Sequence, residues 1–152
     1  MPKFEIESNL SEVPEKLYVE LLSINGVNRE LAPYINMSAP KQWRTKPISE
    51  WPVGERLFNS RVTLFGLIPI DSHSFKFSDV SESGFSETSK TFMHKEWNHT
   101  RSIVKSGAGS KVKDLVDYKS KLRFMGYFLK PFFRVIFKHR HHKLKAIYGT
   151  NN

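Results

Sequence analysis

The chain has 152 residues, of which 39% are hydrophobic and 26% charged, and this composition is typical of a folded protein. It contains no cysteine, which excludes disulfides, thiolate metal sites and a cysteine nucleophile. Residues 1–118 carry 15 cationic and 15 acidic side chains, whereas residues 119–152 carry nine cationic side chains and no acid, giving a net charge of +9. Because no nucleic-acid motif accompanies this surplus, we expect no nucleic-acid partner.

The length and the first residues bound the organisation of the chain. We expect residues 1–152 to form a single domain, since this length supplies one sizeable core. The opening MPKFEIES lacks the apolar stretch of a signal peptide, and the longest apolar run, residues 62–70, is too short to span a membrane. We therefore expect a cytoplasmic protein.

The first part of the chain predicts one strand and two helices. Residues 4–7 alternate between apolar and charged side chains, as a strand does. Apolar residues at helical spacing then follow Ser11, with Pro14 near the start, and predict a helix that ends near residues 25–26. A second, short helix is expected over residues 28–35, where Pro33 interrupts it.

Residues 38–54 are expected to form a long loop. The segment contains three prolines and two tryptophans, without a helical or strand period. Long loops without secondary structure are often functional. Trp43 and Trp51 either pack the loop onto the body of the protein or contact a ligand, and we favour packing.

The middle of the chain predicts an antiparallel meander. Residues 57–70 are apolar on both faces, which favours one long strand covered on both sides. Turns are expected at residues 81–84 and 106–109. They separate further short strands at residues 75–77, 85–91, 95–105 and 110–119.

The C-terminal segment, residues 122–148, predicts a long amphipathic helix. Its apolar side chains recur at spacings of three and four, namely Met125, Phe128, Leu129, Phe132, Phe133, Ile136, Phe137, Leu144 and Ile147. Pro131 predicts a kink or a new helix start. The stripe either packs over the sheet, with the basic face in water, or lies on anionic lipid or a partner. We favour packing, because the strands would otherwise leave one face of the sheet uncovered.

This order of elements predicts an α+β fold, in which a curved antiparallel sheet of about six or seven strands wraps around the C-terminal helix. Two short helices follow the first strand. A curved sheet around a helix leaves a cavity, which is a natural ligand site.

The strand sequence FNSRVTLFGLIPID (residues 58–71), the strand EWNHTRSI (residues 96–103) and the terminal FKHRHHKLKAIYG (residues 137–149) carry a family resemblance. Together with the order of elements, they resemble the SRPBCC or START-like helix-grip superfamily. Its members include lipid-transfer domains and polyketide cyclase-like proteins, and the likeness is to an uncharacterised bacterial subgroup. There the middle strand tends to read Trp-x-His-Glu-Arg, whereas here Thr100 stands where a glutamate is usual. The resemblance implies the fold over nearly the whole chain and leaves the function open.

The candidate site lies on one face of the strand over residues 95–105. Trp97, His99 and Arg101 share that face because strand side chains alternate. If the face lines the cavity, Trp97 walls it, His99 handles a proton and Arg101 binds an anion. The alternative is that Arg101 pairs internally with an acid such as Asp114. The expected ligand-contacting walls are Phe65, Leu67, Phe77, Phe85, Met125, Phe128, Phe132 and Ile136.

We expect neither a metal nor a cofactor. His139 and His142 have a helical spacing that metal ligands use, and His141 lies between them. A zinc site needs three or four protein ligands, no acid follows Asp117, and the surrounding lysines and arginines repel a cation.

Three functions remain open. The first is binding of a hydrophobic or amphipathic small molecule, lipid-like or aromatic, in the cavity. The second is a cyclase or hydratase-type enzyme that uses His99 as general acid or base in the same cavity. The third is contact with a membrane surface or a protein through the basic C-terminal helix, which predicts that Phe133, Phe137 and Tyr148 are exposed. The sequence does not predict an oligomeric state.

Overall fold

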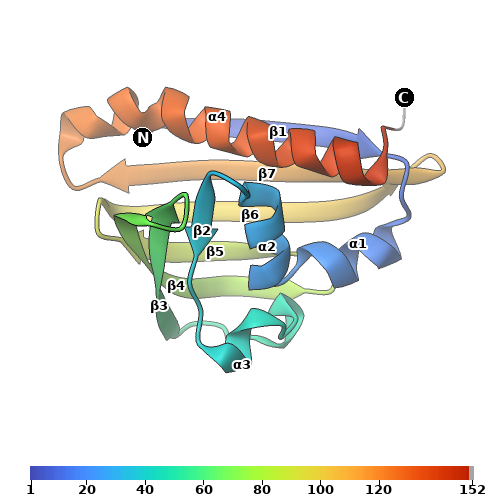
Figure 1. Cartoon of the computed structure of the whole chain (residues 1–152), viewed down its shortest axis with the longest axis horizontal. Helices are drawn as coiled ribbons and strands as arrows, with labels where there is room; N and C mark the ends of the chain where they lie inside the picture. The colour runs from blue at the N-terminus through green and yellow to red at the C-terminus, as the bar shows by residue number, and fades with distance from the viewer. Residues whose placement is uncertain (151–152) are drawn as a thin grey trace.

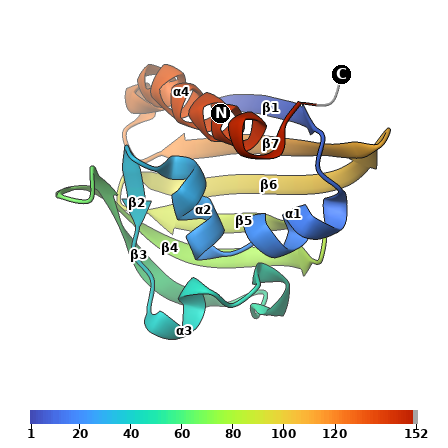
Figure 2. The same ribbon diagram turned by 45° about the vertical axis from the view of Figure 1, so that its right-hand side comes forward.

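The computed structural model describes residues 1–150. Seven antiparallel strands form one sheet in the order β1-β7-β6-β5-β4-β3-β2 (Figure 1). The strands are β1 (Lys3–Leu10), β2 (Ile35–Met37), β3 (Arg56–Leu64), β4 (Ile68–Ser81), β5 (Gly84–Thr91), β6 (His94–Ser106) and β7 (Gly109–Ser120). The sheet curls, so that β2 and β3 stand toward the helices (Figure 2). The predicted α+β class is confirmed.

The helices lie together over one face of this sheet (Figure 2). α1 (Pro14–Leu21) and α2 (Ile24–Leu31) follow β1, while the short α3 (Lys41–Arg44) and the 3-10 helix η1 (Ile48–Glu50) follow β2. The long α4 (Arg123–Tyr148) ends the chain and packs against β1, β7 and α2. α4 is therefore gripped between the first and last strands on one side and a helix on the other.

The strands form where side chains alternate between buried and exposed positions. In β7 the inward positions include Val112, Asp114, Val116 and Tyr118, all fully buried. The chain reverses between β4 and β5 at the predicted turn, and Gly84, at the start of β5, lies tightly against β6. A Cβ atom on Gly84 would come within 2.1 Å of the Arg101 carbonyl oxygen, so only glycine fits there.

Two clusters make up the core. The larger joins both short helices to the middle of the sheet and to the end of α4, and includes Leu17, Ile24, Phe77, Ile103 and Leu144. The smaller lies under the middle of α4 and contains Phe4, Trp97, Val116, Tyr118 and Phe137. The cavity described below lies where these two clusters meet.

The prediction of one long strand over residues 57–70 is wrong. Residues 65–67 form a tight turn instead, and β3 pairs with β4 as a hairpin. Phe65 and Gly66 both adopt positive φ angles, of 54° and 71°. The apolar residues on both sides of this turn hid it, because a buried strand and a hairpin with an apolar tip have the same local composition.

The predicted helix boundaries also differ from the observed ones. The first helix ends at Leu21, and the second begins at Ile24 because the Ser23 hydroxyl accepts a hydrogen bond from the Gly26 amide at 3.0 Å. Residues 38–54 are not structureless, since they contain α3 and η1. Trp51 is buried in the core, and Trp43 packs partly buried against it.

α4 runs through Pro131 as one helix, so the predicted new helix start at this residue is wrong. The helix is 26 residues long, but charged residues recur along it. Among the described residues, no helix combines the length and the apolar character needed to cross a membrane.

Candidate functional site

A cavity of about 130 Å³ lies between the concave face of the sheet, α2 and α4. Its walls are mostly apolar. The sheet contributes Val62, Phe75, Phe77, Phe85 and Trp97, the η1 region contributes Ile48 and Trp51, and α2, α4 and β2 supply Ile24, Val27, Leu31, Ile35, Met37, Phe133, Ile136 and Phe137. Six polar or charged side chains complete the lining: Asp71, His73, Glu87, Thr91, His99 and Arg140.

Five of the predicted site residues line this cavity, namely Phe77, Phe85, Trp97, His99 and Ile136. They come from β4, β5, β6 and α4. Two edge-to-face ring contacts order the wall, with centroids 5.4 Å apart for Phe77 and Phe85 and 5.1 Å apart for Phe85 and His99. Aromatic side chains from three neighbouring strands thus form one continuous surface.

The other predicted wall residues do not line the cavity, and this part of the prediction is wrong. Phe65 and Leu67 lie in the β3–β4 turn and are 57% and 82% exposed. Phe128 and Phe132 are exposed on α4, and Met125 is half-buried away from the cavity. The fully buried residues of α4 are Gly126, Phe137, Arg140, His141, Leu144 and Tyr148, and those that line the cavity are Phe133, Ile136, Phe137 and Arg140.

Arg101 does not reach the cavity either, since it is 1% exposed and lies among buried charges. Its Nε and Nη2 atoms donate to the two oxygens of Asp114 at 2.8 and 2.6 Å, and its Nη1 donates to Glu30 at 2.6 Å. The alternative prediction, that Arg101 pairs internally with Asp114, is confirmed. Sequence reasoning missed Glu30, which lies 71 residues away from Arg101 in a different element.

This buried ion cluster extends to α4. Arg140 donates to Glu30 from both Nε and Nη2, at 3.0 and 2.6 Å. His141 Nε2 lies 2.9 Å from Asp114, and its Nδ1 lies 2.7 Å from the Ser8 hydroxyl on β1. The cluster therefore ties α2, α4 and three strands together beneath the cavity.

The environment keeps the carboxylates of the cluster ionised. Burial alone would raise the pKa of Asp114, but the charge and hydrogen bonds of Arg101 outweigh it and hold that pKa well below its usual range. Burial likewise opposes ionisation of Glu30, but Arg101 and Arg140 lower its pKa. Two buried carboxylates and two buried guanidiniums therefore balance each other.

A second polar group, formed by His73, Glu87 and His99, lies in the cavity wall. Glu87 on β5 is 4% exposed, and it contacts His73 Nε2 through one carboxylate oxygen. His99 stands opposite Glu87 in the strand register, with its Nδ1 3.8 Å from the other oxygen. Burial raises the pKa of Glu87, but His73 outweighs this and lowers it, so the carboxylate is ionised.

His99 links the cavity to the ion cluster. Its Nε2 lies 2.7 Å from Asp114, while the ring lines the cavity. Burial lowers the pKa of His99 in spite of the nearby Asp114 carboxylate. His99 is therefore held in place as a neutral ring. Asp71 and Glu87 are the two carboxylates of the cavity lining, neither has a guanidinium partner among the described residues, and of the two only Glu87 is buried.

Glu87 and His73 were missed by sequence reasoning, although a signal for Glu87 exists. The inward positions of β5 are Phe85, Glu87, Ser89 and Thr91, so polar side chains follow a phenylalanine on the buried face. Polar residues in a row on a buried face indicate a polar patch in the core. His73 has no comparable signal, because its strand could not be located correctly.

The three histidines of α4 do not converge. His139 Nε2 lies 2.9 Å from the Ala32 carbonyl oxygen, His141 belongs to the ion cluster, and His142 is exposed. Among residues 1–150 no group of three or more histidine, aspartate or glutamate side chains has an arrangement that could hold a metal ion.

The exposure of α4 that the membrane or partner function predicts is not observed, whereas the favoured packing of the helix against the sheet is. Phe137 and Tyr148 are 4% and 7% exposed, and Phe133 is half-buried against Trp97. A membrane or partner contact through these three residues is therefore excluded, because they belong to the core.

A family model for a domain of unknown function, DUF8410, matches residues 8–148. The chain belongs to the DUF8410 family. The sequence matches no curated protein. The match covers almost the whole chain as one continuous region. All the cavity residues named above lie within it.

Solved structures with the same fold come from diverse sources. CV1439 from Chromobacterium violaceum superposes with a TM-score of 0.73 at 10% identity, covering 99% of this chain and 100% of that one. Ara h 8.0201 gives 0.58 at 18% identity, with coverage of 95% and 98%. PFC0360w, an HSP90 activator from Plasmodium falciparum, gives 0.61 at 14% identity, with coverage of 98% and 97%.

These similarities confirm the predicted fold. The DUF8410 protein has a helix-grip fold, with a curled antiparallel sheet around a long C-terminal helix, as the resemblance implied. Identities this low show the fold alone and assign neither a ligand nor a reaction.

Proposed function

We propose that this protein binds a small hydrophobic molecule, about the size of one ring and carrying a hydrogen-bond donor, in the cavity between sheet and helices. The observation that carries the proposal is an apolar cavity whose wall contains the buried carboxylate of Glu87, which contacts histidines but no guanidinium among the described residues.

The size of the cavity limits the ligand. Its volume is about 130 Å³. An apolar cavity of about 150 Å³ in another protein admits benzene, whereas sites for drug-sized ligands measure about 300 to 1,000 Å³. Of the two ligand classes expected from the sequence, lipid-like and aromatic, the aromatic class therefore fits this cavity better.

The charge of the wall selects the polar group of the ligand. Glu87 accepts hydrogen bonds and donates none when ionised, and His73 already occupies one of its oxygens. A ligand hydroxyl or ammonium group can donate to the other oxygen, while a second carboxylate would be repelled. The ring of the ligand then packs against Phe85 and Trp97.

The test is a titration with phenol, benzylamine, toluene and benzoate, followed by the fluorescence of Trp51 and Trp97 and by calorimetry. Phenol and benzylamine should bind at least about tenfold more tightly than toluene, since a hydrogen bond to a charged group contributes about 1.5–3 kcal/mol. Benzoate should bind weakest. Equal affinity for all four probes would contradict the role of Glu87.

Two matched variants locate the binding. Ile136→Trp places a large ring in the cavity lining, whereas Val135→Trp adds the same ring at a neighbouring position that is 64% exposed. We expect Ile136→Trp to abolish phenol binding and Val135→Trp to leave it unchanged. If both variants bind phenol equally well, the probe does not enter the cavity and the proposal fails.

A second candidate function is proton-transfer catalysis in the same cavity, favoured by the contact between His73 and Glu87. A histidine oriented by a carboxylate is a common general base. The test is exchange of the α-protons of cyclohexanone in deuterated water, followed by proton NMR. Catalysis predicts that the protein exchanges these protons faster than buffer does and that Glu87→Gln loses this acceleration. If the protein exchanges them only at the buffer rate, the catalytic candidate fails and ligand binding is the remaining function.

A further inference from the structure

The first half of α4 is apolar on both of its sides. Six of the 17 exposed large apolar side chains fall between residues 122 and 135. Phe124, Phe128 and Val135 are 72%, 76% and 64% exposed, although Phe133 and Phe137 on the opposite side pack into the core. A helix with apolar residues all round is normally buried on all sides.

The exposed residues form one stripe and not a scatter. Phe124, Tyr127, Phe128, Pro131 and Val135 follow each other at helical spacings of three and four, which puts them on one face. We call this stripe, together with Phe132, the outer face of α4. Single exposed apolar residues need no explanation, but a contiguous patch marks an interaction site.

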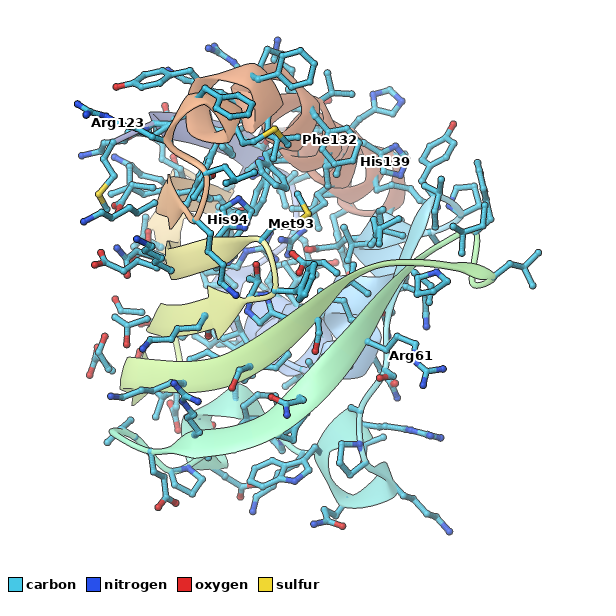
Figure 3. The ribbon with its side chains drawn as sticks, turned by 90° about the vertical axis from the view of Figure 1, so that its left-hand side faces the viewer. Arg61, Met93, His94, Arg123, Phe132 and His139 are labelled. Carbon is cyan, nitrogen blue, oxygen red and sulfur yellow. The ribbon has the colours of Figure 1, made fainter. Side chains whose placement is uncertain are left out.

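A further exposed aromatic residue lies on a neighbouring turn at the same end of the molecule. Phe92, between β5 and β6, is 72% exposed and lies under the Lys121 ammonium group, 5.4 Å from the ring centroid. A backbone hydrogen bond of 3.0 Å from Lys121 to Met93 joins this turn to the start of α4. Figure 3 looks onto this end, with Arg123 and Phe132 on α4 and Met93 on the turn below them.

Basic side chains flank the stripe. Lys130, Arg134 and Lys138 recur every four residues along one flank of α4, and Arg123 lies at its start. No acidic residue follows Asp117 in the sequence, so none on this helix offsets them. Aromatic residues bordered by lysine and arginine on one helix are typical of surfaces that lie at the headgroup level of anionic lipids.

We propose that the outer face of α4 binds the surface of anionic lipid bilayers, with Phe124, Phe128 and Val135 inserted and the basic flank on the headgroups. The charge argues against a second copy as the occupant, because a two-fold dimer through this face would bring like charges together. The inference rests on the outer face alone, and it does not depend on whether the cavity holds a ligand.

The test is flotation of the full chain with vesicles of phosphatidylcholine and with vesicles of phosphatidylcholine and phosphatidylglycerol in equal parts. We expect binding to the anionic vesicles, weak or no binding to the neutral ones, and weaker binding at high salt. Absence of binding to both kinds of vesicle would overturn the proposal.

Two pairs of variants separate insertion from charge. Phe124→Ser with Phe128→Ser should lower vesicle affinity by at least about tenfold, because two rings lose their burial. The control is Val19→Ser, at a position on α1 that is 80% exposed. Arg134→Glu with Lys138→Glu should also lower affinity, whereas Lys41→Glu with Lys90→Glu makes the same change in net charge elsewhere on the surface.

All these positions are exposed, so the variants should fold, and circular dichroism checks this. Two results contradict the proposal. One is vesicle binding that Phe124→Ser with Phe128→Ser leaves unchanged. The other is a wild-type protein that does not bind vesicles and forms a dimer by light scattering, where the same double variant is a monomer. A second copy would then be the partner that covers the outer face of α4.

Discussion

Both halves of α4 carry aromatic and basic residues, but their surroundings are opposite. In the C-terminal half, Phe137, Arg140, His141, Leu144 and Tyr148 are all buried. In the N-terminal half only Gly126 is fully buried, and Phe124, Tyr127, Phe128 and Phe132 are exposed. The difference lies in what each half packs against, because the C-terminal half has α2 and β1 as neighbours and bonds to Glu30 and Asp114.

Gly126 gives a physical reason for the exposed N-terminal half. A Cβ atom at this position would come within 3.3 Å of Pro2, and the Gly126 carbonyl oxygen accepts a hydrogen bond of 2.6 Å from the Tyr118 hydroxyl. The helix therefore approaches the sheet closely through its smallest residue. Phe124, Tyr127 and Phe128, which surround this glycine in the sequence, are 72%, 65% and 76% exposed.

The largest expected difference in stability between the two halves of α4 comes from removing a phenylalanine side chain. Phe137→Ala should lower the free energy of unfolding by about 3–5 kcal/mol, because it empties a buried site next to Phe4 and His99. Phe128→Ala removes the same side chain from an exposed position and should change stability by about 0.5 kcal/mol or less. Urea denaturation measures both. Equal losses would contradict the assignment of the two halves.

Replacing an arginine should also cost more stability in the C-terminal half of α4 than in the N-terminal half, although the difference should be smaller than for phenylalanine. Arg140→Met breaks the buried pair with Glu30 and should cost about 3 kcal/mol. Arg134→Met, on the exposed flank six residues earlier, should cost about 0.5 kcal/mol or less. Thermal and urea unfolding of the two variants measure this. If Arg140→Met is as stable as Arg134→Met, the ion cluster does not hold α4 in place.

The pH dependence of stability should be the smallest of the three effects. Burial lowers the pKa of His94 and of His99 below the ordinary histidine value of 6.5. Such groups contribute stability above pH 6.5, and the contribution is lost as the pH falls through their folded pKa values. Below the ordinary pKa values of 3.8 and 4.5, Asp114 and Glu30 lose their contributions in the same direction.

Urea midpoints measured from neutral pH downward test this expectation. The midpoint should fall as the pH drops below 6.5, and His94→Gln should flatten this part of the curve. His142→Gln, at an exposed position on α4, is the control and should leave the slope unchanged. A midpoint that stays constant or rises on acidification would mean that the buried histidines are charged in the folded protein.

The sequence allowed most of the fold to be predicted, because periodicity is a local property. The strands β5, β6 and β7 and the helix α4 were located to within a few residues. The β3–β4 hairpin was missed, since an apolar tip at Phe65 and Leu67 looks like the middle of a buried strand. That the chain is a single domain and lies in the cytoplasm stays a prediction.

The site was harder to predict because it depends on which residues meet across the fold. Trp97 and His99 were found from strand alternation, and both line the cavity. Glu30 and Glu87 were not, since their partners lie in other elements, although the polar residues on the buried face of β5 are a signal for Glu87. The sequence showed that α4 has apolar residues at helical spacing, but it did not show which face of the helix lies against the sheet. Gly126 marks that face, and a glycine adds nothing to a pattern of apolar side chains.

The central claim is that the cavity between the sheet, α2 and α4 accepts a ring with a donor group. The most direct measurement is a crystal structure of the protein soaked in 4-bromophenol, in which anomalous scattering locates the bromine. We predict a bromine peak inside the cavity among Phe77, Phe85 and Trp97, with the hydroxyl within hydrogen-bonding distance of Glu87. A cavity without the probe, or bromine found on the protein surface alone, would contradict the account.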